Sequence, residues 1–195
     1  MIEDKGFPIK KGYPDSKFYT ESVFLKEEDR PVSRQTEQFE RRLMDDWSFV
    51  FSFDHTSMAP ETVKGEVYLI EVKEGETYYP SVPRVFYSIV PPRKIMVPAM
   101  IHDIMYRYQG GQIENDKLTI CRLLNNEPPE EYKDYVWQEV EVDREFTELV
   151  FHLMMGSCGV SSWKKSLAYY FVCWLGWIYW DNWHVWISNK LNVHG

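Results

Sequence analysis

Residues 140–180 read VEVDREFTELVFHLMMGSCGVSSWKKSLAYYFVCWLGWIYW, and the spacing of their apolar side chains predicts two consecutive α-helices. The first helix covers roughly residues 140–155, because its large apolar residues recur at intervals of three and four and therefore line one face. These residues are Phe146, Leu149, Val150, Leu153 and Met154. Gly156 and Gly159 follow them and are expected to end the helix.

The second helix is expected to begin at Ser161 or Ser162, because serine is a favoured N-cap residue. Its apolar residues again recur at intervals of three and four, which predicts one buried stripe. The stripe consists of Leu167, Tyr170, Phe171, Trp174, Leu175 and Ile178. A further helix is expected upstream, from about Lys94 to about Tyr108, with Pro98 in its first turn.

The residue pattern before these helices predicts extended structure. Residues 47–53, 66–72 and 84–90 are rich in aromatic and β-branched residues, which is typical of short strands. Residues 1–46 lack a sustained apolar period and predict an extended arm with one short helix near residues 35–45. We therefore expect an α+β fold, in which an extended N-terminal arm and short antiparallel strands precede a mainly helical, three-helix core. The expected organisation is an arm (1–46), a single α+β domain (47–187) with an acidic insertion (127–139), and a tail (188–195).

Composition and charge exclude several classes of protein. The 195 residues are 44% hydrophobic and 27% charged, which is ordinary for a soluble globular protein. The net charge of −8 argues against direct binding of nucleic acid, for which a basic domain is expected. The first residues lack the apolar segment of a signal peptide. The longest apolar run, residues 167–180, is shorter than the roughly 20 residues of a transmembrane helix.

The cysteine content predicts free thiols. The chain has three cysteines, Cys121, Cys158 and Cys173, which is an odd number at wide spacing. This pattern fits neither a disulfide framework nor a zinc site. Buried thiols in a reducing compartment are therefore the favoured interpretation.

His102, Asp103 and Tyr106 form an HDxxY pattern on the helix that begins near Lys94. Helical geometry places His102 and Tyr106 one turn apart on the same face, whereas Asp103 points partly elsewhere. His102 could then act as a base and Asp103 as a metal ligand, provided that a third group orients the imidazole. A packed structural histidine is the other interpretation, and it is the favoured one.

The HDxxY pattern resembles the catalytic helix of calcium-dependent secreted phospholipases and of parvoviral capsid phospholipases. The resemblance implies that His102 activates water, that Asp103 binds calcium and that Tyr106 supports the network. In those families a second aspartate orients the histidine, and Asp143 is the best-placed candidate in this chain. The alternative role of Asp143 is that of a helix N-cap or an exposed acid.

A longer resemblance covers residues 75–180. The elements that carry it are, in order, Ser81-Val82-Pro83-Arg84, Pro91-Pro92, the helix with His102, Asp103, Tyr106 and Arg107, the start Asp143-Arg144 with Phe146, the segment Gly159-Val160 with Trp163-Lys164-Lys165, and Gly176 with Trp180. This ordered set resembles a small family of uncharacterised proteins of tailed bacteriophages and prophages, a domain of unknown function. The resemblance implies a viral protein of the virion or tail, located in the virion or the host cytoplasm. Its partners would be other phage proteins or further copies of itself as a homo-oligomer.

Tryptophan is concentrated near the C-terminal end, where six of the eight residues lie between Trp163 and Trp186. Trp is enriched both at protein interfaces and at membrane surfaces. The scarcity of Lys and Arg in this region disfavours contact with a membrane or lipid, since interfacial helices usually carry cations. We therefore expect a partner-binding surface that contains Trp177, Trp183 and Trp186.

Two functions remain open. The favoured one is a bacteriophage virion- or tail-associated structural or interaction protein without a cofactor, which requires an exposed aromatic patch. The alternative is a phospholipase-like hydrolase of lipid or cell envelope that uses calcium. The hydrolase requires His102 to face a cleft, with Asp143 within hydrogen-bond reach of its ring. Whether the chain is an enzyme depends on which of these requirements is met.

Overall fold

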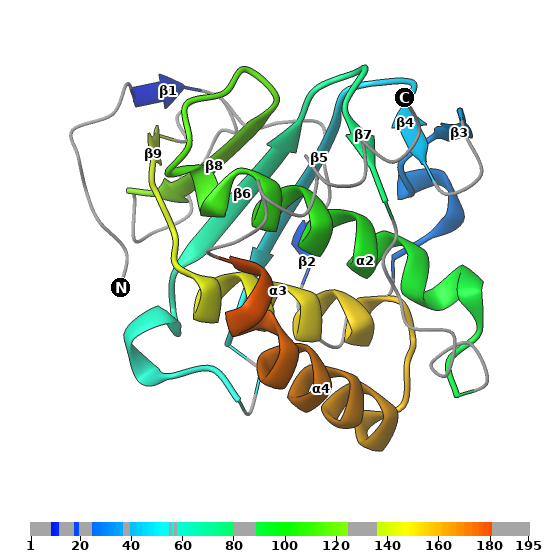
Figure 1. Ribbon diagram of the computed structural model, residues 1–195. Helices are drawn as coiled ribbons and strands as arrows, with labels where there is room; N and C mark the ends of the chain where they lie inside the picture. Colours follow the sequence, from blue (N-terminus) through cyan, green and yellow to red (C-terminus); the bar gives the residue numbers. More distant parts are fainter. Residues whose placement is uncertain are drawn as a thin grey trace.

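The larger of two β-sheets forms the base of the fold (Figure 1). In this computed structural model the described residues are 9–11, 18–19, 25–36, 40–54, 56, 58–79, 89–124 and 136–180. The sheet has six strands in the order β1-β9-β8-β6-β5-β2. Their bounds are β1 Ile9–Lys11, β2 Phe18–Tyr19, β5 Trp47–Ser52, β6 Val67–Val72, β8 Leu118–Leu123 and β9 Val136–Glu139.

Two of the six strands confirm the sequence patterns, and the other four were not predicted as strands. The runs at residues 47–53 and 66–72 form β5 and β6, which pair antiparallel from Trp47 opposite Val72 to Ser52 opposite Val67. β8 and β9 extend the sheet antiparallel beyond β6, although β9 lies at the end of the predicted acidic insertion. The predicted strand at residues 84–90 lies largely outside the described residues.

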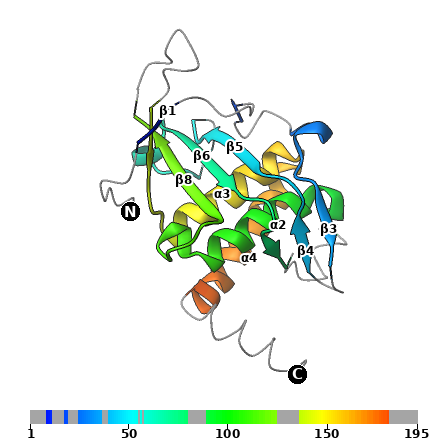
Figure 2. The same cartoon turned by 90° about the horizontal axis from the view of Figure 1, so that it is seen from above.

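A smaller antiparallel sheet lies next to α2 (Pro92–Arg107), as Figure 2 shows. Its strands are β3 Ser33–Gln35, β4 Arg41–Leu43 and β7 Thr77–Tyr78. The predicted short helix near residues 35–45 is therefore wrong. β4 pairs with β3 on one side and with β7 on the other, and its Leu43 is fully buried. The described segments of the predicted arm thus contribute strands to both sheets.

Three α-helices complete the described structure, which confirms the α+β class. They are α2, α3 Arg144–Ser157 and α4 Ser162–Trp180, and single 3-10 turns cover η1 Glu27–Asp29, η2 Glu61–Val63 and η3 Gln109–Gly111. α2 begins earlier than predicted, so that Pro92 occupies its first turn and Pro98 lies inside the helix. None of the described helices combines the length and apolar character needed to cross a membrane.

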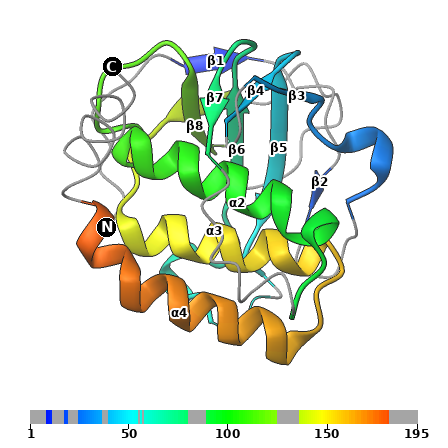
Figure 3. The same ribbon diagram turned by 45° about the vertical axis from the view of Figure 1, so that its right-hand side comes forward.

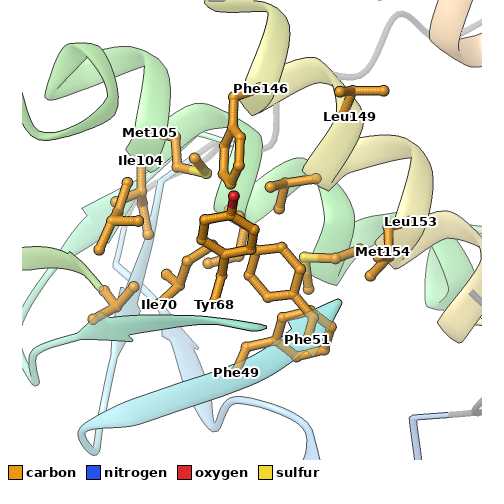
Figure 4. Close-up of a cluster of buried hydrophobic side chains, with 14 of the residues drawn as sticks. Phe49, Phe51, Tyr68, Ile70, Ile104, Met105, Phe146, Leu149, Leu153 and Met154 are labelled. Carbon is orange, nitrogen blue, oxygen red and sulfur yellow. The ribbon is translucent and has the colours of Figure 1, made fainter. Parts of the chain in front are cut away.

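The helices form two layers over one face of the larger sheet. α2 and α3 lie against the sheet, and α4 packs mainly on the outer side of α3 (Figures 1 and 3). Figure 4 shows aromatic side chains of β5 and β6 meeting apolar side chains of α2 and α3 in this core. The ring of Phe146 on α3 packs edge-on against Tyr68 on β6, with 4.8 Å between the ring centroids.

α4 buries a different face from the one predicted. Its inner side is formed by small or partly buried residues, with Ala168 and Gly176 buried against the neighbouring helices. Four large side chains instead form an exposed outer face of α4, namely Trp163, Leu167, Tyr170 and Trp174. The buried stripe predicted for this helix is therefore wrong at Leu167, Tyr170 and Trp174. Apolar residues occupy almost every side of α4, so periodicity could not distinguish the inner face from the outer one.

Candidate functional site

The HDxxY helix α2 directs its polar side chains to two different neighbours. His102 and Tyr106 lie one turn apart on the same side, as predicted, with 4.1 Å between their ring centroids. Asp103 contacts the smaller sheet instead, where it accepts a hydrogen bond from the backbone N–H of Tyr79. The structure therefore separates the predicted base from the predicted metal ligand.

His102 is held by aromatic rings. Its imidazole packs against Tyr106 and meets Phe151 of α3 edge-on at 5.3 Å between centroids. Nε2 is buried and has no hydrogen-bond partner in the described part of the chain, although the residue as a whole is only half-buried. Burial, rather than a neighbouring carboxylate, lowers the pKa of His102 to about 3. The imidazole is consequently neutral at physiological pH.

Asp103 belongs to a polar clamp between α2 and β7. Its Oδ2 lies 2.8 Å from the backbone nitrogen of Tyr79 and 3.6 Å from Nη2 of Arg107. Nη1 of Arg107 in turn donates to Glu76 and to the carbonyl of Thr77, each at 2.5 Å. The carboxylate of Asp103 is almost fully buried, so these contacts position it as a structural acceptor.

The buried Glu76 completes this clamp. Its Oε2 accepts a hydrogen bond from the hydroxyl of Tyr108 at 3.0 Å, while Oε1 faces Arg107. Burial raises the pKa of Glu76, and the positive charge of Arg107 opposes that shift. Burial, assisted by the Glu76 carboxylate, raises the pKa of Tyr108 to about 12.

Tyr106 reaches a carboxylate that the sequence patterns did not single out. Its hydroxyl donates to Oε1 of Glu148 on α3 at 3.0 Å, and the same oxygen lies 3.6 Å from Nε of Arg144. Glu148 is only 2% exposed, and burial followed by this carboxylate raises the pKa of Tyr106. Glu148 lies outside the apolar stripe of α3, on the side of the helix that α4 covers, so the periodicity of apolar residues could not indicate that it is buried.

Asp143 has the role of a helix N-cap, the alternative that the sequence left open. Its Oδ1 accepts a hydrogen bond from the backbone N–H of Phe146 at 2.9 Å, which satisfies a free donor in the first turn of α3. The acidic residue of this helix that reaches Tyr106 of the HDxxY pattern is therefore Glu148. Orientation of His102 by Asp143 is not among the described contacts of the imidazole and stays a prediction.

Helix α4 covers the Tyr106–Glu148 pair at very close range. A Cβ atom placed on Gly176 would lie 2.2 Å from the Tyr106 hydroxyl and 2.5 Å from Oε1 of Glu148. Burial, followed by hydrogen bonding to Glu148, raises the pKa of the Cys173 thiol to about 12. The pair is thus enclosed by three helices, which favours a packing role over access for a substrate.

Calcium does not fit the donor set around Asp103. Among the described residues, no group of three or more His, Cys, Asp or Glu side chains could hold a metal ion. The carboxylate already faces a backbone N–H and the Arg107 guanidinium, both of which repel a cation. No reaction step through calcium follows from this geometry.

The predicted partner-binding tryptophans lie outside the described side chains. Trp177 belongs to α4, but its side chain is not described, and Trp183 and Trp186 fall in residues 181–195. The exposed aromatic residues that the structure does describe lie earlier on the same helix, on the outer face of α4. Apolar residues occupy almost every side of α4, so no signal in the sequence singles out this face.

Comparison with known proteins identifies a family without indicating an activity. No curated protein and no solved structure matches the chain at a significant level. Residues 57–172, which include β6, α2, β8, β9, α3 and the first half of α4, match the family described as "Protein of unknown function (DUF1353)". The match covers more than half of the 195 residues, and the chain therefore belongs to the DUF1353 family.

Proposed function

We propose that this chain is an interaction protein that assembles with other subunits through the outer face of α4. The resemblance of its ordered motifs to proteins of tailed bacteriophages makes a virion or tail the proposed setting. The single observation that carries the proposal is the exposure of the outer face, where Trp163 is 63%, Tyr170 61% and Trp174 69% exposed. Large exposed apolar patches on soluble proteins mark sites of interaction.

The inner and outer faces of α4 support this function together. The inner face is already packed against α2 and α3, so the exposed rings are not required to anchor the helix. Exposed aromatic side chains add unfavourable contact with water and do not stabilise the fold of a single chain. A partner that covers them explains why four large side chains occupy positions where polar residues would suffice.

The contacts of the HDxxY helix favour this function over the hydrolase alternative. A general base needs a partner that orients it and a path to substrate. The described contacts of His102 are aromatic rings, and Asp103 is engaged with Tyr79 and Arg107. In the proposed function, His102 and Asp103 therefore have a structural role, which is to pack α2 against its neighbours.

The proposal is tested by following the chain into particles. In the strain that encodes it, particles are purified on a density gradient, and the chain is quantified in each fraction by mass spectrometry. We expect it to co-sediment with particles and Leu167→Glu to remain in the soluble fraction. Val32→Glu is the matched control, because Val32 is an equally apolar, 60% exposed residue away from α4. A wild-type chain found wholly outside particles would overturn the virion assignment.

A second experiment addresses the hydrolase alternative directly. Wild type and His102→Ala are compared in a calcium-supplemented assay with phospholipid vesicles. We expect no hydrolysis that depends on His102. Calcium-dependent hydrolysis that is present in wild type and absent from His102→Ala would contradict the proposed function and favour the enzyme.

A further inference from the structure

We infer that the outer face of α4 binds a second copy of this chain, with the two α4 helices antiparallel across a two-fold axis. This inference rests on the proposed function and names the partner. The four members of the outer face, Trp163, Leu167, Tyr170 and Trp174, are spaced by four, three and four residues. This alternation of three and four is the spacing of the contact seam between two packed helices.

The spacing is also symmetric about its centre, which selects the antiparallel arrangement. A two-fold axis between positions 168 and 169 places Trp163 opposite the partner subunit's Trp174. The same axis places Leu167 opposite the partner subunit's Tyr170. A two-fold interface uses the same patch on both subunits and must therefore be self-complementary. In a parallel pair each residue would instead face the same residue of the partner subunit, Trp163 facing Trp163 and Leu167 facing Leu167. The symmetric spacing of the four residues would then have no role.

The exposed area reaches the size that a specific dimer needs. An aromatic side chain carries about 150–250 Å² of surface, so the three exposed rings offer about 400 Å² on each copy. With the half-exposed Leu167, two copies contribute about 1,000 Å² in total, the lower limit for a biological interface. The patch from Trp163 to Trp174 extends about 16 Å along the helix, at a rise of about 1.5 Å per residue.

The charge distribution permits two copies to approach along this face, although each chain carries −8. After Lys165, α4 contains no charged residue up to Trp180. Lys164, which follows Trp163 in the sequence, donates to the carbonyl of Ile89 at 2.6 Å and lies 5.5 Å from the Trp163 ring. The ammonium group of Lys164 is therefore engaged in contacts within its own chain. A membrane surface would be expected to require more cations beside the rings.

The first test measures the oligomeric state of the full-length chain. Sedimentation equilibrium over a concentration series is compared for wild type, Leu167→Glu and the control Val32→Glu. Both substitutions replace an exposed aliphatic residue by the same acid. We expect wild type and Val32→Glu to dimerise with the same Kd, and Leu167→Glu to dimerise at least about 30-fold more weakly, as for an interface hot spot. Trp174→Ser is a second seam variant with the same expected effect, should Leu167→Glu fail the circular dichroism check for folding.

The second test addresses the antiparallel arrangement. Adding Tyr170→Lys to Leu167→Glu places opposite charges across an antiparallel seam, but like charges across a parallel one. We expect the double variant to recover at least about tenfold of the affinity lost by Leu167→Glu, as for a paired interfacial charge. Lack of recovery would overturn the antiparallel arrangement.

The outcomes separate this inference from the proposed function. A wild-type chain that is monomeric at all concentrations, or a Leu167→Glu chain that dimerises as wild type does, would overturn the self-association. If such a chain still enters particles through the outer face, its partner is a different protein, and the proposed function survives. If it binds anionic phospholipid vesicles instead, through the same residues, the face is a membrane contact and the inference is again overturned.

Discussion

The close approach of α4 to the Tyr106–Glu148 pair predicts that Gly176→Ala destabilises the fold. The added methyl group would lie 2.2 Å from the Tyr106 hydroxyl and 2.5 Å from the Glu148 carboxylate. Neither atom can move aside easily, because Tyr106 is packed between His102 and the edge-on ring of Trp180, and Glu148 is buried. The helix α4 must therefore shift outward to admit the methyl group.

The expected magnitude follows from three opposing contributions. Alanine is favoured over glycine inside a helix by about 1 kcal/mol. Overpacking a well-filled site costs about 1–3 kcal/mol. Weakening the Tyr106–Glu148 hydrogen bond in a buried position costs about 1–3 kcal/mol more. We expect a net loss of about 1–5 kcal/mol, and each kcal/mol lowers the Tm of a chain of this size by about 2–4 °C.

Urea and thermal unfolding followed by circular dichroism measure this effect. The matched control is Ser166→Ala, a half-buried position of α4 where alanine should be neutral or slightly stabilising. Tyr106→Phe removes the hydroxyl that obstructs the methyl group, so the double variant should lose less stability than the sum of the two single variants. A Gly176→Ala chain as stable as wild type, with additive behaviour in the double variant, would refute the described packing of α4.

Three further predictions follow from the same structure. Asp143→Ala should lower the free energy of unfolding by about 1 kcal/mol, whereas Asp143→Ser should retain it, because serine also caps helices; equal loss in both would contradict the N-cap. The pKa of His102 is about 3 in the folded chain and 6.5 for a free imidazole. Between pH 6.5 and pH 3, therefore, the imidazole takes up a proton in the unfolded state but not in the folded state. The free energy of unfolding should therefore fall as the pH drops below about 6.5, by up to about 1.4 kcal/mol per pH unit. In urea titrations at several pH values, His102→Gln should make this pH dependence weaker. A pH dependence that is the same in His102→Gln and wild type would count against burial of the ring. Burial raises the pKa of Cys158 to about 11 and, together with Glu148, that of Cys173 to about 12, so both thiols should react with iodoacetamide at least about 30-fold more slowly in the native chain than in urea; similar rates would refute the enclosure of these thiols.

The helices and central strands were predictable because their local pattern agrees with their environment. The stripe from Phe146 to Met154 is buried along α3, and the strands at residues 47–52 and 67–72 pair as the central part of the sheet. In these segments one side faces a single core, so the period of apolar residues reports the secondary structure directly. The strands β4, β8 and β9 carry weaker patterns, and they owe their conformation to pairing with strands distant in the sequence.

The amino-acid sequence alone was sufficient for the α+β class, for the helical placement of His102 and Tyr106 on one side of α2, and for the concentration of aromatic residues near the C-terminal end. These properties depend on local periodicity and composition. The tertiary structure was needed to show that Glu148, rather than Asp143, meets the HDxxY helix, and that Leu167 and Trp174 face outward. A helix that is apolar on nearly all sides carries no record of which neighbour it packs against, because that choice depends on close contacts such as the one at Gly176.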